Sequence, residues 1–274
     1  MARPLTGEVI IITGASSGIG AATALACARA GMDVVLNARR PERLAAVAAQ
    51  VAQLGRHAAT VAGDAADEHL PDRLLDTAAQ RFGRFDVVFA NAGYGQHAAM
   101  HEMDEADLRR IFEVNFFAAN RLLCAAARRL ISQQRPGHLL MCSSAVAKFA
   151  LPTFSAYSAT KAAQNHVCRA MRLELRPYGI EVASAHPITT RTEFFDEAAR
   201  RSSGHTAAPV APGRGLPRWL IQRPEDVAAA VVRCLRRPRP EVWTSHTVRL
   251  FAALVTAFPS LFDALAPLHQ RRRP

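Results

Sequence analysis

The sequence predicts an α/β protein built on a doubly wound parallel sheet, and three observations support this prediction. Short runs rich in β-branched residues alternate with longer Ala-, Leu- and Arg-rich segments that have helical spacing. The strand-like runs are mostly apolar, as in a parallel sheet covered by helices on both faces. No linker or internal repeat interrupts the first 190 residues. Right-handed crossovers between parallel strands then give the doubly wound arrangement.

The individual elements follow in chain order. The predicted strands are Val9–Ile12, Val34–Leu36, Ala58–Val61, Val87–Ala90, Leu139–Cys142 and Val182–Ala185. The predicted helices between and after them are Ala21–Ala30, Glu42–Leu54, Leu70–Phe82, Asp104–Ser132 and Ser155–Arg176. Another helix is expected to open at Arg223–Asp226, where Pro and two acids favour a helix N-terminus. A short strand is expected around Glu241–Thr244.

The domain organisation expected from this pattern is one catalytic domain with an extension. Residues 1–245 form the predicted domain, within which residues 193–223 form a substrate loop. Residues 202–218 are rich in Gly, Pro and Ser and predict a mobile segment. Residues 246–274 form an apolar and basic C-terminal helical extension.

The composition narrows the function classes. The chain has 274 residues, is 50% hydrophobic and 21% charged, and so falls in the globular range. Its net charge of +11 could indicate a polyanionic partner. However, the arginines are spread along the chain, and the one dense basic block is Arg271–Arg273. We therefore expect no nucleic-acid partner.

Sequence signals of location point to the cytoplasm. There is no run of about 18 apolar residues, which a membrane-spanning helix requires. The first residues lack the apolar stretch of a signal peptide. Five scattered cysteines, odd in number and without CxxC spacing, argue for a reducing compartment and against a disulfide framework or a zinc site.

A glycine-rich loop predicts a nucleotide site. Thr13–Gly20 follows the first predicted strand and opens the first helix, which is the context that a dinucleotide-binding loop requires. Glycines let the backbone approach a pyrophosphate, and the helix N-terminus adds its positive dipole end. The residues assigned to this contact are Gly14, Ser16, Ser17, Gly18, Ile19 and Gly20.

The end of the second strand predicts NADP as the cofactor. An NAD site would carry an acid there, for the ribose 2′-hydroxyl, but the sequence reads Asn37, Ala38, Arg39, Arg40. An unopposed guanidinium suits a 2′-phosphate, which its planar fork matches. The alternative is that Arg39 and Arg40 are two solvated loop arginines of an Arg-rich chain.

Two more strand ends carry candidate cofactor contacts. Asp64 could accept a hydrogen bond from the adenine amino group, or cap the following helix. Asn91, Ala92 and Gly93 follow the fourth strand and place a glycine where backbone must approach a ligand. Both positions lie at carboxyl ends of strands, where open α/β sheets bind ligands.

Tyr157 and Lys161 are the candidate proton-transfer pair. Their spacing of four within a helical segment places both on one face. A nearby ammonium favours phenolate and would lower the tyrosine pKa. Such a pair could exchange a proton with a carbonyl or alcohol oxygen during hydride transfer. Because the only lysines in the chain are Lys148 and Lys161, chance alone would place a lysine at this position about once in a hundred chains.

Together these motifs resemble the classical short-chain dehydrogenase/reductase family. The resemblance covers about residues 5–236 and rests on Thr13–Gly20, Asn91-Ala92-Gly93, Asn115, Ser144 and Tyr157-x-x-x-Lys161. It implies a Rossmann fold, with Tyr157 as general acid/base and Lys161 lowering its pKa and holding the nicotinamide ribose. It also implies that Ser144 binds the substrate oxygen and that Asn115 supports a relay water. Only the thirteen-residue spacing to Tyr157 favours Ser144 over Ser143.

The segment after the sixth strand departs from the family pattern. The family usually has Pro-Gly there, followed by a Thr that binds the nicotinamide carboxamide. This chain keeps Pro187 and the threonines Thr190 and Thr192, but Ile188 replaces the glycine. The resemblance further implies a homodimer or homotetramer built on the long helices Asp104–Ser132 and Ser155–Arg176.

The last two segments leave alternatives open. The substrate segment contains several large apolar residues, which either line an apolar substrate pocket or pack against one another in a small cluster. They are Phe194, Phe195, Leu216, Trp219 and Leu220. The apolar segment Val248–Leu268, with the basic Arg271–Arg273 beside it, packs on the core or on another subunit, docks peripherally on a membrane, or covers the substrate.

The sequence therefore predicts an NADP-dependent oxidoreductase that interconverts a hydrophobic ketone or aldehyde and an alcohol. Enoyl reduction or epimerisation on the same fold is the alternative reaction. A non-catalytic nucleotide sensor is a further alternative, against which the set of Ser144, Tyr157 and Lys161 argues, because a sensor needs no proton donor.

Overall fold

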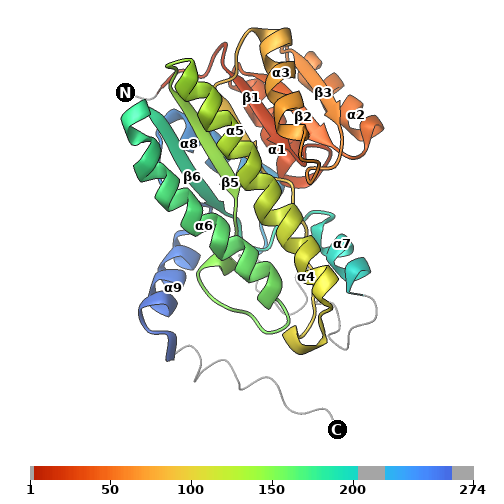
Figure 1. Ribbon diagram of the computed structural model, residues 1–274, viewed down its shortest axis with the longest axis vertical. Coiled ribbons are helices and arrows are strands. Elements are labelled where there is room, and N and C mark those ends of the chain that lie inside the picture. The colour runs from red at the N-terminus through yellow and green to blue at the C-terminus, as the bar shows by residue number, and fades with distance from the viewer. Residues whose placement is uncertain (1–2, 203–219, 261–274) are drawn as a thin grey trace.

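The computed structural model describes residues 3–202 and 220–260, and a parallel seven-stranded sheet lies at its centre (Figure 1). The strand order is β3-β2-β1-β4-β5-β6-β7, and every pairing is parallel. The strands are β1 (Val9–Thr13), β2 (Asp33–Ala38), β3 (Ala58–Ala62), β4 (Val87–Ala90), β5 (Gly137–Cys142), β6 (Ile180–His186) and β7 (Glu241–Trp243). This confirms the predicted doubly wound α/β fold.

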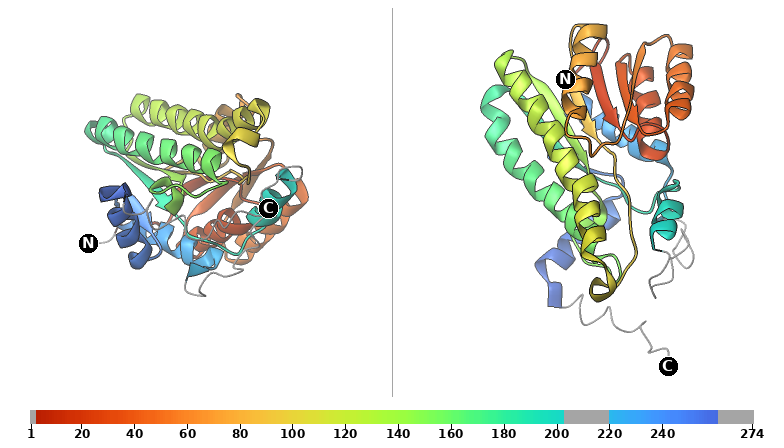
Figure 2. Two further views of the ribbon diagram at one scale, coloured as in Figure 1. Left: turned by 90° about the horizontal axis from the view of Figure 1, so that it is seen from below. Right: turned by 45° about the vertical axis from the view of Figure 1, so that its right-hand side comes forward.

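Helices cover both faces of the sheet (Figure 2). One hydrophobic cluster joins the sheet to α1 (Gly18–Arg29), α2 (Pro41–Gln53) and α8 (Pro224–Arg236). A second cluster on the other face joins it to α3 (Leu70–Phe82), α5 (Ala118–Ser132) and α6 (Ser155–Leu175). The central strands are buried on both sides, which explains why their sequences are continuously apolar.

Two helical features differ from the prediction. The expected helix Asp104–Ser132 divides into α4 (Glu105–Phe112), a π-helical turn at Glu113–Phe117, and α5. Segment 193–223, expected as a loop, contains α7 (Phe194–Arg201) within its described part. Periodicity could not indicate the π turn, because one wide turn changes the hydrogen bonding but little of the apolar spacing.

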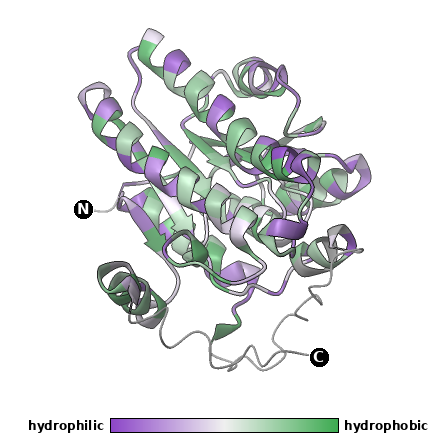
Figure 3. Cartoon of the chain, turned by 60° about the horizontal axis from the view of Figure 1, so that its bottom comes forward, coloured by the Kyte–Doolittle hydropathy of each residue, from purple (hydrophilic) through white to green (hydrophobic). Residues whose placement is uncertain are grey.

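The C-terminal extension begins with α9 (His246–Ala257), which packs on the body through one face. Val248, Ala252 and Val255 are buried, and the Phe251 ring lies 5.5 Å from that of Phe149. The residues of α9 are mostly hydrophobic (Figure 3); its other face leaves Leu250 and Leu254 exposed, and Phe258 directly after the helix is exposed as well. Packing on the core is thus confirmed for one face of α9. Residues 261–274, which include Arg271–Arg273, lie outside the described residues.

The topology also fixes where a ligand can enter. The chain moves from β1 outward through β2 and β3, then returns to β4 on the other side of β1. The loops that leave β1 and β4 therefore diverge at the carboxyl edge of the sheet, which leaves a crevice between them. Within the described ranges, no helix is long and apolar enough to cross a membrane.

Candidate active site

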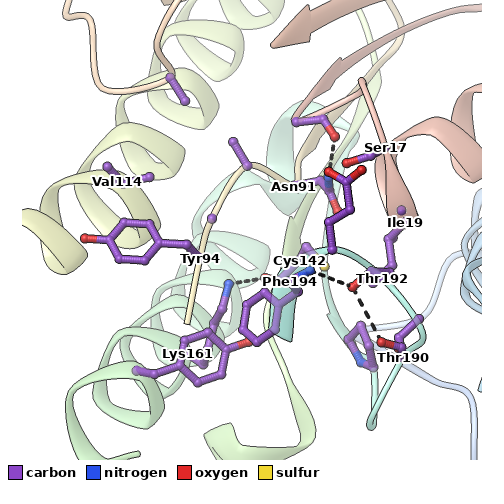
Figure 4. A pocket seen from close by; sticks show the side chains of 18 of the residues that line it. Ser17, Ile19, Asn91, Tyr94, Val114, Cys142, Lys161, Thr190, Thr192 and Phe194 are labelled. Carbon is purple, nitrogen blue, oxygen red and sulfur yellow. Dashed lines mark hydrogen bonds between the residues drawn. The ribbon is translucent and has the colours of Figure 1, made fainter. Parts of the chain in front are cut away.

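A cavity of about 850 Å³ lies at this carboxyl edge. Its wall is made by the loops that follow β1, β2, β3, β4, β5 and β6, together with the start of α6 and of α7. Figure 4 shows Lys161, Phe194, Thr192 and Asn91 around the same opening. The predicted nucleotide and proton-transfer residues thus meet in one cavity.

The glycine-rich loop has the geometry that a dinucleotide requires. Gly14 and Gly18 have positive φ values of 66° and 55°, which side chains disfavour. A Cβ atom on Gly20 would lie 2.2 Å from the carbonyl oxygen of Gly14, so only glycine fits there. The first turn of α1 contains no acid and its N-cap, Ser17, makes no side-chain cap, which leaves its N–H groups available to a phosphate. These features fit a bound pyrophosphate.

Asn91 holds this loop in place. Its side-chain amide donates to the carbonyl oxygens of Thr13 at 3.0 Å and Gly14 at 3.3 Å. In return, the Thr13 hydroxyl accepts hydrogen bonds from the backbone N–H groups of Asn91 and Ala92. Asn91 therefore shapes the cofactor site by joining the loops of β1 and β4. Gly93 lines the cavity beside Asn115, whose Oδ1 would lie 2.9 Å from a Cβ at that position.

The predicted 2′-phosphate site differs from expectation in one respect. Arg39 and Arg40 both line the cavity, but the Arg40 guanidinium is opposed by an acid. Glu193, which is 153 positions away, accepts a hydrogen bond of 2.9 Å from Arg40 Nη1 and another from Arg43. The two guanidinium partners lower the pKa of Glu193. The prediction of an unopposed Arg40 was therefore wrong, because the opposing acid comes from a remote segment that the end of β2 does not reveal.

Asp64 lines the cavity at the end of β3, and its carboxylate is engaged by the protein. One oxygen accepts from the backbone N–H of Ala66 at 3.0 Å, and the other pairs with Arg110 at 3.0 Å. The local bond belongs to the turn before α3, whose own N-cap is His69, so Asp64 does not cap that helix.

The segment after β6 keeps its expected place despite Ile188. Pro187, Ile188, Thr190 and Thr192 all line the cavity. The non-glycine residues with positive φ in the described ranges are Gln134 and Thr153, so the backbone at position 188 does not require glycine. The Thr190 hydroxyl donates to the Ile188 carbonyl at 2.8 Å. Ile188 is thus accommodated without left-handed backbone.

Tyr157 lies on the first turn of α6 and is buried between two aromatic rings. Its ring centroid is 4.7 Å from that of Phe154 and 5.3 Å from that of Phe194. The Ser144 side chain lies close enough to Tyr157 to lower its pKa, and its hydroxyl oxygen accepts from the backbone N–H of Val146 at 3.4 Å. Ser143 instead donates to the backbone carbonyl of Lys161 at 2.8 Å. Ser143 lines the cavity while Ser144 acts on the Tyr157 pKa, so the choice of Ser144 over Ser143 stays a prediction.

The electrostatics of the pair differ from the expectation that Lys161 lowers the tyrosine pKa. Burial raises the pKa of Tyr157, and hydrogen bonding from Ser144 offsets this only in part. The Lys161 ammonium lies 5.5 Å from the Tyr157 ring centroid, but it donates to the Cys142 carbonyl at 2.7 Å and to Gln164 at 3.2 Å. Burial lowers the pKa of Lys161 to about 8. In this geometry the loss of hydration therefore has a larger effect on the pKa of Tyr157 and of Lys161 than the attraction between opposite charges.

Asn115 lies in the π-helical turn, fully buried. Its side chain bonds to the backbone N–H and carbonyl of Tyr94, at 3.0 and 2.9 Å. Its backbone carbonyl accepts from Gln164, whose other amide atom accepts from Lys161. The Gln164 side chain thus links the Lys161 ammonium to the Asn115 backbone carbonyl. Sequence reasoning missed Gln164, although its position three residues after Lys161 places both on one helix face.

The rest of the cavity forms an apolar wall. Phe194 contributes to it as expected, whereas Leu220 is not in its lining. Leu216 and Trp219 lie outside the described residues, and so does the side chain of Phe195. The apolar residues that sequence reasoning missed are Tyr94, Val114, Val146, Leu151, Pro152 and Phe154, and the polar ones nearby are His97 and Arg200.

Comparisons with known proteins agree with this geometry. The short chain dehydrogenase family matches residues 8–202. An uncharacterised oxidoreductase from Mycobacterium tuberculosis is 33% identical over 257 residues, covering 94% of this chain and 95% of its own. An alcohol dehydrogenase structure from Thermococcus sibiricus, complexed with 5-hydroxy-NADP, is similar at 28% identity with a TM-score of 0.72, covering 86% of this chain and 95% of its own.

A short-chain dehydrogenase/reductase structure from Burkholderia phymatum, in complex with NAD, has a TM-score of 0.83. It covers 95% of this chain and 96% of its own, and its 23% identity shows a shared fold. The chain belongs to the short-chain dehydrogenase family. It is an oxidoreductase of a family that uses NAD or NADP.

Proposed function

We propose that this protein is an NADP-dependent oxidoreductase that interconverts a hydrophobic ketone or aldehyde and the corresponding alcohol. The observation that carries the proposal is that Tyr157 and Lys161 line the same cavity as the glycine-rich loop and the apolar residues, with Ser144 close enough to Tyr157 to lower its pKa. Proton transfer, cofactor binding and substrate binding can then occur within a single cavity.

The state of Tyr157 suits the reduction of a carbonyl. Because burial raises its pKa, the hydroxyl is protonated at neutral pH and can act as general acid. A reduced nicotinamide supplies the hydride when it is bound. The Tyr157 hydroxyl gives its proton to the carbonyl oxygen, which becomes the alcohol oxygen, and Ser144 holds that oxygen by a hydrogen bond. Lys161, mostly protonated at neutral pH, supports the phenolate that remains.

The preference for NADP rests on the charges at the end of β2. Three arginines, Arg39, Arg40 and Arg43, gather there against two carboxylates, Glu193 and Glu42 on the first turn of α2, which leaves a net positive charge for a 2′-phosphate. NADPH should therefore be used better than NADH. Equal use, or better use of NADH, would remove the role given to Arg39 and Arg40.

The test of the reaction is Tyr157→Phe, assayed by the absorbance of reduced nicotinamide against a panel of hydrophobic aldehydes and ketones. The variant should lose turnover by about 100-fold or more and keep its affinity for NADPH, because only the proton donor is removed. Tyr178→Phe is the matched control, since Tyr178 is exposed and outside the cavity lining. Equal turnover in wild type and Tyr157→Phe would overturn the proposal.

The same proposal covers assembly and location. We infer a cytoplasmic homodimer or homotetramer built on α4, α5 and α6, to be tested by light scattering after size exclusion.

Peripheral membrane contact through residues 248–273 stays a prediction, motivated by the exposed Leu250 and Leu254 of α9. Co-sedimentation with anionic liposomes should fall in a Leu250→Ser/Leu254→Ser variant, and an unchanged result would count against this contact.

A further inference from the structure

The carboxylate of Glu193 lies between two guanidinium groups at the cofactor end of the cavity. Arg40 Nη1 donates to Oε2 at 2.9 Å, and Arg43 donates to Oε1, so both oxygens are engaged. The two guanidinium groups lower the pKa of Glu193, which is therefore an anion at neutral pH. About half of each side chain remains exposed, so a solute anion can reach the same groups.

Arg40 hydrogen-bonds both to Glu193 and to the glycine-rich loop. Arg40 Nη2 lies 3.2 Å from the hydroxyl oxygens of both Ser16 and Ser17, to which it donates. Beside this bond, Thr192 packs closely on Gly18, since a Cβ atom on that glycine would lie 2.9 Å from Thr192 Cγ2. Residues 192–193 therefore lie across the glycine-rich loop and are held there by Arg40.

A 2′-phosphate would need the guanidinium groups that Glu193 occupies. Carboxylate and phosphate oxygens both accept paired N–H donors from arginine, so the two anions compete for one site and repel each other when close. We propose that Glu193 is a specificity-determining residue that takes the place of the 2′-phosphate on Arg40 and Arg43. This inference rests on the proposed binding of NADP at the end of β2.

The next residue connects this competition to the reacting end of the cavity. The Phe194 ring centroid lies 5.3 Å from that of Tyr157, and its Cζ atom would be 2.5 Å from a Cβ on Gly95. Glu193 and Phe194 are adjacent in the chain, so the residue that competes with a 2′-phosphate lies next to one that packs beside the proton donor.

The experiment compares Glu193→Gln with Glu174→Gln by calorimetric titration with adenosine 2′,5′-bisphosphate and with adenosine 5′-monophosphate. Glu174 is an exposed residue near the end of α6 and outside the cavity lining, so its variant has the same charge change elsewhere. Glu193→Gln removes the carboxylate from Arg40 and Arg43, so both guanidinium groups become available to the 2′-phosphate. Binding of the bisphosphate should therefore tighten about three- to tenfold. The monophosphate should change by less than about twofold, and Glu174→Gln should match wild type.

Three results would overturn the inference: an equal gain for both nucleotides, no change for the bisphosphate, or weaker bisphosphate binding in Glu193→Gln. Thermal melting of Glu193→Gln and Glu193→Asp shows whether the fold is kept in each variant, and Glu193→Asp should retain the wild-type ratio of the two affinities. The wild-type ratio of NADP to NAD affinity tests the proposed function separately. If wild type prefers NAD but Glu193→Gln gains only bisphosphate affinity, the NADP assignment fails while the role of Glu193 stands.

Discussion

Lys161 is a buried ammonium held by two neutral oxygens, and its environment makes the stability of the fold depend on pH. The oxygens belong to the Cys142 backbone and the Gln164 side chain. Burial lowers the pKa of Lys161 from 10.5 to about 8. Between these two values the unfolded chain binds more protons than the folded one, so the free energy of unfolding rises with pH.

The magnitude follows from the two pKa values. Each pKa unit corresponds to about 1.4 kcal/mol, so the contribution of Lys161 should rise by about 3 kcal/mol as the pH increases from 7 to 10.5. Buried thiols act in the opposite direction at alkaline pH, because burial raises the pKa of Cys27 and Cys168 to about 12. The contribution of Lys161 must therefore be taken as a difference between two proteins.

The assay is urea unfolding of wild type and Lys161→Met, with the pH varied from 7 to 10.5. The free energy of unfolding of wild type minus that of the variant should become more positive by about 3 kcal/mol over this range. Lys148→Met, which removes the other lysine of the chain, is the control and should retain the wild-type increase. A difference between wild type and Lys161→Met that stays constant within about 0.5 kcal/mol would refute the claim that burial lowers the pKa.

Three other predictions concern the loop, the lysine partner and a structural carboxylate. Gly20→Ala should abolish nucleotide binding, measured by calorimetry, because its Cβ atom would meet the Gly14 carbonyl oxygen at 2.2 Å. Gln164→Leu removes an acceptor from the Lys161 ammonium, so it should lower kcat more than it changes KM and move the alkaline limb of the pH profile to lower pH. Asp86→Ala should cost about 2–4 kcal/mol in urea unfolding, because the buried carboxylate accepts hydrogen bonds from a backbone N–H and two arginines.

Each of these has a matched control or a contrary outcome. Gly55→Ala places a methyl group in open space at a glycine with a positive φ of 72°, so it should cost stability and leave nucleotide binding intact. An unchanged pH profile in Gln164→Leu would show that the amide does not act through Lys161. Asp76→Ala breaks a surface pair with Arg129 and should cost less than about 1 kcal/mol.

The elements that sequence periodicity located correctly are those whose burial is regular. The six expected strands of the sheet and the edge strand β7 all form, within about two residues of the predicted ends. Because β1, β4 and β5 are buried along their whole length, each position carries the same apolar signal. The helix α7 was missed because it is short and follows a turn whose sequence resembles a loop.

In the candidate site, the local motifs were predictable and their partners were not. The glycine-rich loop and the spacing of Tyr157 and Lys161 are visible as short patterns, because a tight turn and a helix face each fix residue types at fixed intervals. The bond from Lys161 to Gln164 also has helical spacing and could have been found. The contact of Gln164 with the Asn115 carbonyl could not, because it depends on the π-helical turn.

The sequence by itself determined the doubly wound sheet, the glycine-rich loop and the candidate proton-transfer pair, because these depend on neighbours within one or two turns of chain. The tertiary structure alone decided what surrounds them. Burial, which no local pattern measures, raises the pKa of Tyr157 and lowers that of Lys161. The fold also brings Glu193 to Arg40 across 153 positions, because crossovers gather the carboxyl ends of distant strands at one edge.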